Sequence, residues 1–376
     1  MSAQSADGTY GLSSVEKAAT IAAPALPYLP PQPRAYRPKI ALIGCGGISE
    51  HHLRAYAAMG LDVVALCNRN AAKADQRRAG FFPAARVYAD YREVLVRDDI
   101  AVVDITLPPA ARASVIEAAL HAGKHVLSQK PFVLDLDDGR RLADLADARG
   151  LKLAVNQNGR WAPHFSYLTA AVDAGLVGEV ATIDCTLQWD HTWTARTPFD
   201  DVHHLVLLDF GIHWFDIIAR LMRGRPARRV WAGVSRAPHQ KMIPPILAHA
   251  LIDFDGAQAR LNFNGHVILG QEDRTVICGT KGTLRSFGPS LSDQSVTLHT
   301  AEGTAHAALE GTWFTNGFQG AMGELLCAIE ENRAPSHSAR NVLDSLALCF
   351  AALASADSGE PQIPGTTKMA SGTTSH

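Results

Sequence analysis

The chain has 376 residues, 47% of them hydrophobic and 19% charged, which excludes a disordered chain and a coiled coil. Single cores usually stop growing near ~250 residues, so we expect two domains. Lysine plus arginine (35) nearly balances aspartate plus glutamate (37), which argues against a nucleic-acid partner. The six cysteines form no CxxC pair, and no apolar run approaches the ~18 residues of a membrane span. These features predict a cytoplasmic protein with free thiols and no membrane insertion.

The first 37 residues are predicted to form an N-terminal arm. Prolines recur between Pro24 and Pro38, with leucine and tyrosine among them. Such a segment is expected neither to pair in a sheet nor to continue a helix. Two interpretations stay open: a tail without contacts, or an arm laid across a surface that buries Leu26 and Tyr28.

Residues 38–158 alternate short apolar runs with segments of helical spacing. Continuous apolar strands that alternate with helices are typical of a parallel sheet covered on both faces. The sequence therefore predicts a doubly wound, Rossmann-type dinucleotide-binding domain. The expected strands are Ile40–Ile43, Val63–Cys67, Val102–Ile105, His125–Leu127 and Leu153–Val155, and the expected helices include Ser114–Ala122 and Asp137–Arg149.

Residues 159–376 show a different pattern. Successive strands joined by turns such as Asp255-Gly256 and Lys281-Gly282 predict an α+β domain with a large, mainly antiparallel sheet. The expected strands begin at Glu179 and continue with Val230–Ser235, Leu251–Phe254, Ala259–Asn264 and Thr275–Cys278. Helices are expected at about Phe165–Ala174, Asp209–Met222, Gly317–Asn332 and Ala339–Ala356.

A glycine-rich turn follows the first strand of the doubly wound domain and precedes a helix. In this context Gly44 permits a tight turn, and Gly46 lets the backbone approach a pyrophosphate at the helix N-terminus. The second strand ends at Asn68 and Arg69, where an NAD enzyme usually has a carboxylate for the ribose 2′-hydroxyl. A neutral amide followed by a cation gives a slight preference for NADP(H) over NAD(H).

Two further motifs carry polar side chains to expected ligand-binding positions. An apolar strand delivers Lys130 to its carboxyl end, the edge where ligands bind in an open α/β sheet. On the predicted helix Asp209–Met222, Asp209 and His213 stand four residues apart and therefore share one face. A polar stripe at the start of a helix can line a cleft.

Together these motifs resemble those of the Gfo/Idh/MocA oxidoreductases: a GxGG(I/V)S turn, a GKHV strand ending in (E/Q)KP, and DxGxHxxD on a later helix. The resemblance covers about residues 38–365 in order and spacing. It implies NAD(P)-dependent hydride transfer to or from a secondary alcohol or ketone of a sugar, sugar derivative or cyclitol. It also implies a homodimer or homotetramer built through the second-domain sheet. In one member of the family a proline-rich arm packs on a neighbouring subunit.

The resemblance assigns the catalytic roles to Lys130, Asp209 and His213. Histidine titrates near operating pH and suits removal of the hydroxyl proton, while a lysine cation stabilises a developing alkoxide. Lys130 is the alternative proton-transfer group, and Asp209 would orient the substrate or the imidazole. The residues expected to contact the cofactor are Gly44, Gly46, Gly47, Ile48, Asn68, Arg69, Pro108, Gln129 and Lys130.

Two positions depart from the family pattern. Gln129 replaces the usual glutamate before the lysine, and Arg112 stands where relatives often carry a histidine after the fourth strand. The substrate is further expected to meet aromatic and hydrogen-bonding groups, since these suit a polyol. The residues expected there are Arg160, Trp161, Trp189, Asp190 and His191.

No metal site is expected, because the histidines around Asp209 lack HExxH or CxxC spacing. Two other functions stay open beside the dehydrogenase or reductase. One is an NAD-dependent glycosidase that uses transient hydride transfer, and the other is a cofactor-binding sensor without turnover.

Overall fold

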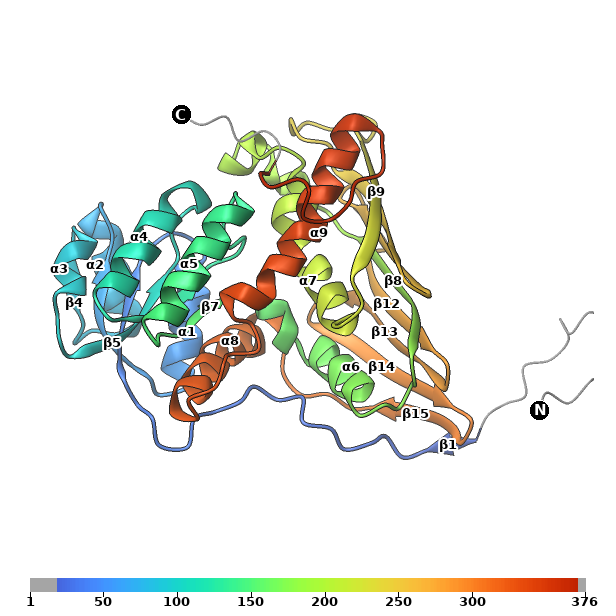
Figure 1. The fold of residues 1–376 in the computed structure, drawn as a ribbon, viewed down its shortest axis with the longest axis horizontal. Coiled ribbons are helices and arrows are strands. Elements are labelled where there is room, and N and C mark those ends of the chain that lie inside the picture. The colour runs from blue at the N-terminus through green and yellow to red at the C-terminus, as the bar shows by residue number, and fades with distance from the viewer. Residues whose placement is uncertain (1–18, 371–376) are drawn as a thin grey trace, which may run out of the picture.

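The computed structural model describes residues 19–370 and shows two sheets with helices between them (Figure 1). The first 18 residues of the predicted arm lie outside this part of the chain, as do residues 371–376. One sheet is parallel and of Rossmann type, and the other is large and mainly antiparallel. The predicted fold class is therefore confirmed.

Within the described residues, six parallel strands form the first sheet in the order β4-β3-β2-β5-β6-β7. Most of their side chains are buried, as expected for a sheet covered on both faces. Every strand predicted for this domain is present, and the short edge strand β4 was not predicted. The strands are β2 (Lys39–Ile43), β3 (Asp62–Cys67), β4 (Arg86–Tyr88), β5 (Ile100–Ile105), β6 (His125–Ser128) and β7 (Leu153–Val155). The helices that connect them are α1 (Ser49–Ala58), α2 (Ala71–Phe81), α3 (Tyr91–Leu95), α4 (Pro109–His121) and α5 (Leu136–Ala148).

Two hydrophobic cores lie on the two faces of this sheet, because successive strand residues point in opposite directions. Ile40 faces the core that includes α1, whereas Ala41 faces the core beneath α4 and α5. A helix late in the sequence, α8 (Trp313–Glu330), packs into the first core through Phe318 and Met322. The Rossmann sheet is thus covered on one face by a segment from the other end of the chain.

The second sheet has nine strands in the described chain, in the order β1-β15-β14-β13-β12-β8-β11-β10-β9. All neighbours are antiparallel except β1 with β15 and β8 with β11. Its strands are β1 (Thr20–Ile21), β8 (Val180–Gln188), β9 (Ala227–Ser235), β10 (Leu247–Phe254), β11 (Ala257–Asn264), β12 (Glu272–Gly279), β13 (Gly282–Ser290), β14 (Asp293–Thr300) and β15 (Gly303–Ala307).

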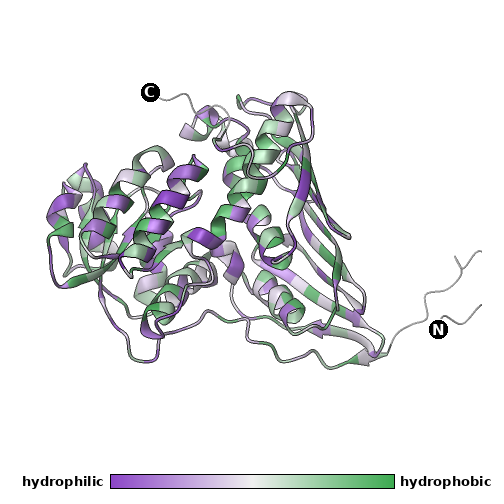
Figure 2. Cartoon of the chain, in the orientation of Figure 1, coloured by the Kyte–Doolittle hydropathy of each residue, from purple (hydrophilic) through white to green (hydrophobic). Residues whose placement is uncertain are grey.

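One face of this large sheet is covered by α6 (Pro163–Asp173), α7 (Ile212–Leu221) and α9 (Ala339–Ser358). No element of residues 19–370 covers the opposite face (Figure 1). Figure 2 shows that α9, which lies between the two sheets, is largely hydrophobic. By length and composition alone α9 could cross a membrane, but 61% of its apolar window is buried inside the protein, which is typical of a core helix.

The described part of the arm packs against other elements of the same chain. The expectation that it would not pair in a sheet is wrong for Thr20–Ile21, which precede the first proline and pair with β15. Beyond them the arm is extended and runs along the lower edge of the molecule to the Rossmann domain (Figure 1). Tyr28 packs edge-on against Tyr167 with ring centroids 6.1 Å apart, and Glu330 at the end of α8 accepts three backbone hydrogen bonds from residues 34–36.

Candidate active site

The carboxyl ends of the parallel strands open onto a cavity of about 950 Å³ that both domains line. Ligands bind at this edge of open α/β sheets. The segments after β2, β3, β5 and β6 supply one wall, and residues of the second domain and of α8 supply the other. The lining residues are Gly44, Cys45, Gly46, Gly47, Ile48, Asn68, Arg69, Asn70, Lys73, Thr106, Leu107, Pro108, Arg112, Gln129, Lys130, Asn158, Trp189, His191, Trp193, Pro198, Phe199, Asp209, Phe210, His213, Trp214, Leu291, Trp313 and Phe314.

The glycine-rich turn leaves room for a ligand. Gly44 has a φ of 104°, which favours glycine, and a Cβ there would lie 3.0 Å from the backbone of Leu107. A Cβ on Gly46 or Gly47 would meet nothing within 4 Å, and within the described chain their N–H groups have no acceptor. Free N–H groups at the start of α1 suit a pyrophosphate, so this turn fits a dinucleotide.

Asn68 is engaged within the protein. Its Oδ1 accepts a hydrogen bond from the N–H of Cys45 at 3.1 Å, and its Nδ2 donates to the carbonyl of Asn70 at 2.9 Å. Arg69 and Lys73 line the same end of the cavity and are exposed, and neither forms an ion pair with any residue in the part of the chain that the structure describes. The cavity therefore has two available cations beside the end of β3.

Lys130, Asp209 and His213 come from distant parts of the sequence and line the cavity together. Lys130 Nζ donates to the backbone carbonyl of Asp209 at 2.7 Å and lies 3.0 Å from its Oδ2. Asp209 thus orients the lysine. No carboxylate pairs with His213 among the described residues, and its Nδ1 is buried without a hydrogen-bond partner. Burial, and then the charge of Lys130, hold the pKa of His213 well below its ordinary value of 6.5.

The helix predicted over Asp209–Met222 is wrong at its start. Val206–Phe210 form a π-helical turn in which the N–H of Gly211 donates to the carbonyl of Val206 at 2.8 Å, and α7 begins only at Ile212. A Cβ on Gly211 would lie 2.8 Å from the carbonyl oxygens of Val206 and Leu207, so glycine is needed where the turn meets the helix. This wider turn carries Asp209 toward Lys130.

A fully buried network that was not predicted lies behind Lys130. Asp104 Oδ2 lies 2.7 Å from His52 Nδ1, and His52 Nε2 lies 3.1 Å from the side-chain nitrogens of Gln129 and Asn156. Gln129 Oε1 in turn accepts from the N–H of Lys130 at 2.7 Å. Because the amides act as donors to His52 Nε2, the His52 proton lies on Nδ1 and points to Asp104. The chain of contacts fixes the amide of Gln129 beside the catalytic candidate.

Arg112 holds the same loop from the other side. It is 1% exposed, and its guanidinium donates to the carbonyls of Leu107 at 3.0 Å, Gln129 at 2.5 Å and Pro131. Burial lowers the pKa of Arg112 to about 9, so the group remains charged at neutral pH. The position that departs from the family pattern is thus filled by a side chain that binds backbone and leaves no ring in the cavity.

The residues predicted to contact substrate divide into two groups. Trp189 and His191 line the cavity with their rings stacked at 5.4 Å. Arg160, Trp161 and Asp190 do not line it. Arg160 forms a buried ion pair with Asp216 at 2.6 Å, Trp161 packs edge-on against His337, and Asp190 accepts from the N–H of Thr192 at 2.9 Å.

Two other features of the described chain lie outside this cavity. The Nε2 atoms of His203 and His204 lie 2.8 and 2.7 Å from Asp357 Oδ1. The side-chain atoms with which these three residues could hold a metal ion lie within 4.8 Å of one another.

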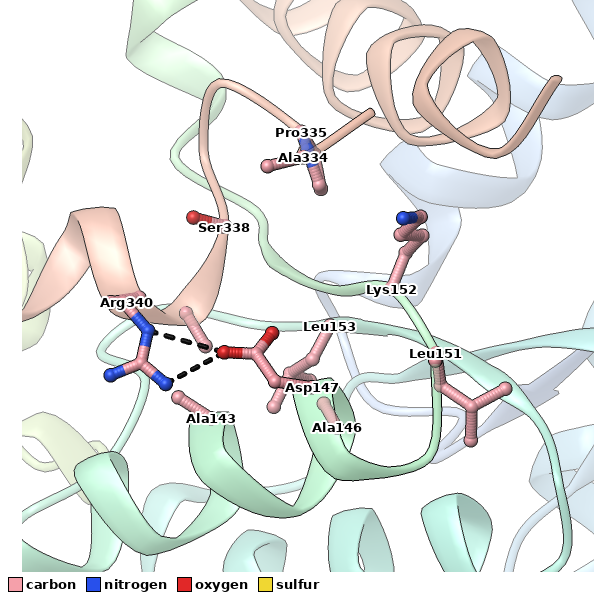
Figure 3. Close-up of a pocket in the computed structure, with 12 residues that line it drawn as sticks. Ala143, Ala146, Asp147, Leu151, Lys152, Leu153, Ala334, Pro335, Ser338 and Arg340 are labelled. Atoms are coloured by element: carbon pink, nitrogen blue, oxygen red, sulfur yellow. Dashed lines mark hydrogen bonds and ion pairs between the residues drawn. The ribbon is translucent and has the colours of Figure 1, made fainter. Parts of the chain in front are cut away.

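A second pocket of about 260 Å³ lies between the end of α5 and the start of α9. Figure 3 shows Arg340 paired with Asp147 at one end of it and Lys152 at the other.

A parallel sheet whose strand ends open onto a cavity of this composition defines the class of the protein, a dinucleotide-binding oxidoreductase. The chain belongs to the Gfo/Idh/MocA family. The sequence model described as "Oxidoreductase family, NAD-binding Rossmann fold" matches residues 38–157, and the model of the GFO/IDH/MocA C-terminal domain matches residues 165–285. The protein is accordingly an NAD(P)-dependent oxidoreductase with a small-molecule substrate.

Relatives of known name agree with this membership. D-apiose dehydrogenase of Paraburkholderia graminis is 27% identical, and the match covers 89% of this chain and 94% of that protein. Inositol 2-dehydrogenase of Rhizobium meliloti is 26% identical, with coverage of 84% and 96%. An oxidoreductase from Agrobacterium radiobacter, solved in complex with NAD+, L-tartaric acid and magnesium, superposes with a TM-score of 0.79 at 22% identity, covering 88% of this chain and 99% of that one. None of these three proteins is named as a glycosidase or a sensor.

Proposed function

We propose that this enzyme transfers a hydride between a nicotinamide dinucleotide and a secondary alcohol or ketone of a sugar, sugar derivative or cyclitol. The observation that carries the proposal is one cavity that joins the glycine-rich turn to Lys130, Asp209 and His213. The names of D-apiose dehydrogenase and inositol 2-dehydrogenase, which both act on such compounds, support the substrate class.

The turn at Gly44–Ile48 would hold the pyrophosphate with its free N–H groups, and Pro108, Gln129 and Lys130 would contact the nicotinamide half. The nicotinamide supplies the hydride acceptor in oxidation and the donor in reduction. All other chemistry falls to side chains of the protein.

In our proposal His213 removes the hydroxyl proton during oxidation and returns it during reduction. Its low pKa keeps it unprotonated at neutral pH, which is the form that a general base needs. Lys130 carries the positive charge that stabilises a developing alkoxide, and Asp209 keeps the ammonium group in place through the contact at 3.0 Å. Lys130 itself remains the alternative proton-transfer group.

We further propose NADP(H) as the preferred cofactor. The Asn68 amide, which has one partner within the protein at each end, is neutral and would not repel a 2′-phosphate as a carboxylate would. Arg69 and Lys73 are exposed in the cavity without ion-pair partners in the described chain, and a 2′-phosphate would supply the missing negative charge.

The test is the initial rate of NADPH or NADH formation with a panel of sugars, sugar glycosides and cyclitols. His213→Ala and Lys130→Met should each lower turnover by ~10² to 10⁴ while cofactor binding, followed by fluorescence titration, survives. Arg149→Lys, an exposed change at the end of α5, serves as the control. Near-normal turnover in both site variants would remove these two side chains from the reaction.

A further inference from the structure

The wall of the cavity that the second domain and α8 supply is built mainly of aromatic rings. We call this wall the aromatic end. Seven rings line it, and they come from the loop after β8, from the π-helical turn, from α7 and from the start of α8. The rings are Trp189, Trp193, Phe199, Phe210, Trp214, Trp313 and Phe314.

Three of these rings form one cluster. Trp193 meets Phe199 edge-on with centroids 5.4 Å apart, and Phe210 lies 5.9 Å from Phe199 and 6.3 Å from Trp193. Trp193 is 56% exposed although a tryptophan side chain gains much from burial. Phe314, which lines the same cavity from α8, is 44% exposed. These rings therefore present apolar surface that a bound molecule could cover.

The aromatic end has no lysine or arginine among its lining residues that could pair with an acidic ligand. Of the four lysine and arginine side chains in the lining, Arg69 and Lys73 lie at the end of β3 and at α2, beside the glycine-rich turn. Arg112 is buried against backbone carbonyls, and Lys130 is paired with Asp209. A sugar phosphate, a nucleotide-linked sugar or a sugar acid would bring a negative charge to rings that offer no counter-charge.

The side chains that could hydrogen-bond to hydroxyl groups of a substrate are also few on this wall. The polar side chains of the aromatic end are Asn158, His191 and His213, beside the Lys130–Asp209 pair. Asn158 already accepts a hydrogen bond from the indole N–H of Trp313 at 2.9 Å, and burial lowers the pKa of His191 to about 4, which leaves it neutral. The remaining lining residues, Pro198 and Leu291, are apolar. A free polyol suits the partners beside Lys130, but hydroxyl groups buried against the phenyl rings of Phe199 and Phe210 would have no partner, at a cost for each one.

We infer that the substrate is a neutral glycoside with an aromatic aglycone: the sugar lies at Lys130 and His213, and the aglycone ring packs against Trp193, Phe199 and Phe210. The inference rests on the proposed function for its reacting end. The cluster adds ring contacts of the offset or edge-on kind that aromatic groups favour, and one such contact is worth roughly a tenfold gain in binding. Oxidation of a secondary hydroxyl of the sugar leaves the aglycone attached, and the hydride and proton are accounted for by the dinucleotide and His213.

The experiment compares matched phenyl and methyl β-D-glycosides of glucose, galactose and xylose, together with UDP-glucose and glucuronate as charged arms. The full-length enzyme is assayed for NAD(P)H formation, and binding of each compound is measured separately by calorimetry. Trp193→Ala removes one ring of the cluster and Trp193→Phe restores a smaller one. Tyr91→Ala, at a half-buried aromatic residue of α3 that stacks on Arg92 outside the cavity, is the control.

We expect phenyl glycosides to have at least a tenfold advantage in kcat/KM over methyl glycosides, an advantage that Trp193→Ala removes, Trp193→Phe partly restores and Tyr91→Ala leaves intact. Equal rates for phenyl and methyl glycosides, or a preference for UDP-glucose or glucuronate, would overturn the inference and leave the proposed function standing. If no sugar is oxidised, the proposed function fails, and calorimetry still decides the inference: tighter binding of phenyl glycosides that depends on Trp193 supports it, and equal or absent binding rejects it.

Discussion

Asp209 pairs with Lys130 and not with His213 at the reacting end of the cavity. Its Oδ2 lies 3.0 Å from Lys130 Nζ, and within the described chain His213 has no anionic partner. A buried imidazole beside a cation and without a carboxylate binds a proton weakly, which is the physical cause of the low pKa of His213. The three residues thus divide into an ion pair and a neutral base.

The pH dependence of alcohol oxidation should follow from this division. A general base must be unprotonated, and the lowered pKa of His213 means that protonation sets in only well below pH 6.5. We expect the acid limb of kcat/KM in the oxidation direction to lie below pH 6.5, and activity to be flat through neutral pH. The measurement is the kcat/KM profile with a cofactor concentration that saturates at every pH. A limb at or above pH 6.5 would contradict the role of a buried neutral His213.

The sequence predicted which residues line the cavity better than it predicted the contacts of those residues. Lys130 and His213 were named from motifs because each follows a recognisable element. His52 and Asp104 were not named, because their pairing joins a helix to a strand 52 residues away and only the folded sheet brings them together. A signal did exist, since Asp104 is the one charge within the apolar run Val102–Ile105. Arg160 looked like a cavity residue from its place at the domain junction, but its buried ion pair with Asp216 holds it away.

Cofactor choice gives a second test at the scale of single residues. If Arg69 binds a 2′-phosphate, Arg69→Ala should weaken NADP binding roughly ten- to hundred-fold, since charge-assisted contacts are worth about 1.5–3 kcal/mol, and should change NAD binding little. Dissociation constants for both cofactors come from fluorescence titration. Arg86→Ala is the control, because Arg86 is exposed on β4 and stacks on Tyr88 outside the cavity. Equal losses for the two cofactors, or wild-type binding of NAD alone, would show that the proposed preference for NADP is wrong.

At the scale of elements, periodicity located the strands and helices because burial follows it. The failures occurred where hydrogen bonding departs from the regular patterns. The π-helical turn Val206–Phe210 has the same residue types as the helix after it, so no spacing separates the two. Strand β4 is only three residues long and was too short to show an alternation. The loop after β6 was predicted from its Lys-Pro pair, but the arginine that holds it comes from α4.

That loop supplies a prediction about Arg112. Lysine carries the same charge on a single ammonium group and cannot reach the carbonyls of Leu107, Gln129 and Pro131 together, as the forked guanidinium does. Each buried acceptor left unpaired costs roughly 1–3 kcal/mol. We expect Arg112→Lys to lower both the melting temperature and kcat. Arg149→Lys, exposed at the end of α5, should change neither.

The readout that separates positioning from plain destabilisation is activity measured well below the melting temperature of the variant. If Arg112 positions the loop, kcat remains low there although the protein is fully folded. A variant that regains wild-type kcat in the cold would show that Arg112 contributes only to stability.

At the scale of the whole molecule, one face of the large sheet is covered by no element of residues 19–370. We propose that it pairs with the same face of a second copy and gives a homodimer or homotetramer. Phe287 on β13 is 51% exposed there, and large apolar side chains at a sheet surface are typical of interfaces. Phe287→Glu should lower the mass seen by light scattering, whereas an unchanged mass would place the interface elsewhere or show a monomer.

The arm joins the two domains of one chain, and its removal is the last test. Residues 34–36 donate three backbone hydrogen bonds to Glu330 of α8, and Tyr28 packs on Tyr167 while its hydroxyl accepts from the N–H of Glu310 at 2.9 Å. Because α8 also lines the cavity and covers the Rossmann sheet, deletion of residues 1–36 should lower the melting temperature and raise the cofactor dissociation constant.

Single substitutions at Tyr28 and Glu330 identify which arm contact matters. Tyr28→Ala removes the ring and the hydroxyl, whereas Tyr28→Phe keeps the ring, so a loss seen only with alanine assigns the effect to packing.

The hydrogen bonds from Ala35, Arg34 and Tyr36 lower the pKa of Glu330. The stability that Glu330 contributes to the folded protein is therefore present above the ordinary glutamate pKa of 4.5 and is lost as pH falls through the lower folded value. The difference in melting temperature between wild type and Glu330→Gln should accordingly shrink in acid. If the truncated chain melts at the wild-type temperature, binds cofactor equally well and keeps its mass in light scattering, the arm contributes nothing to folding, cofactor binding or assembly.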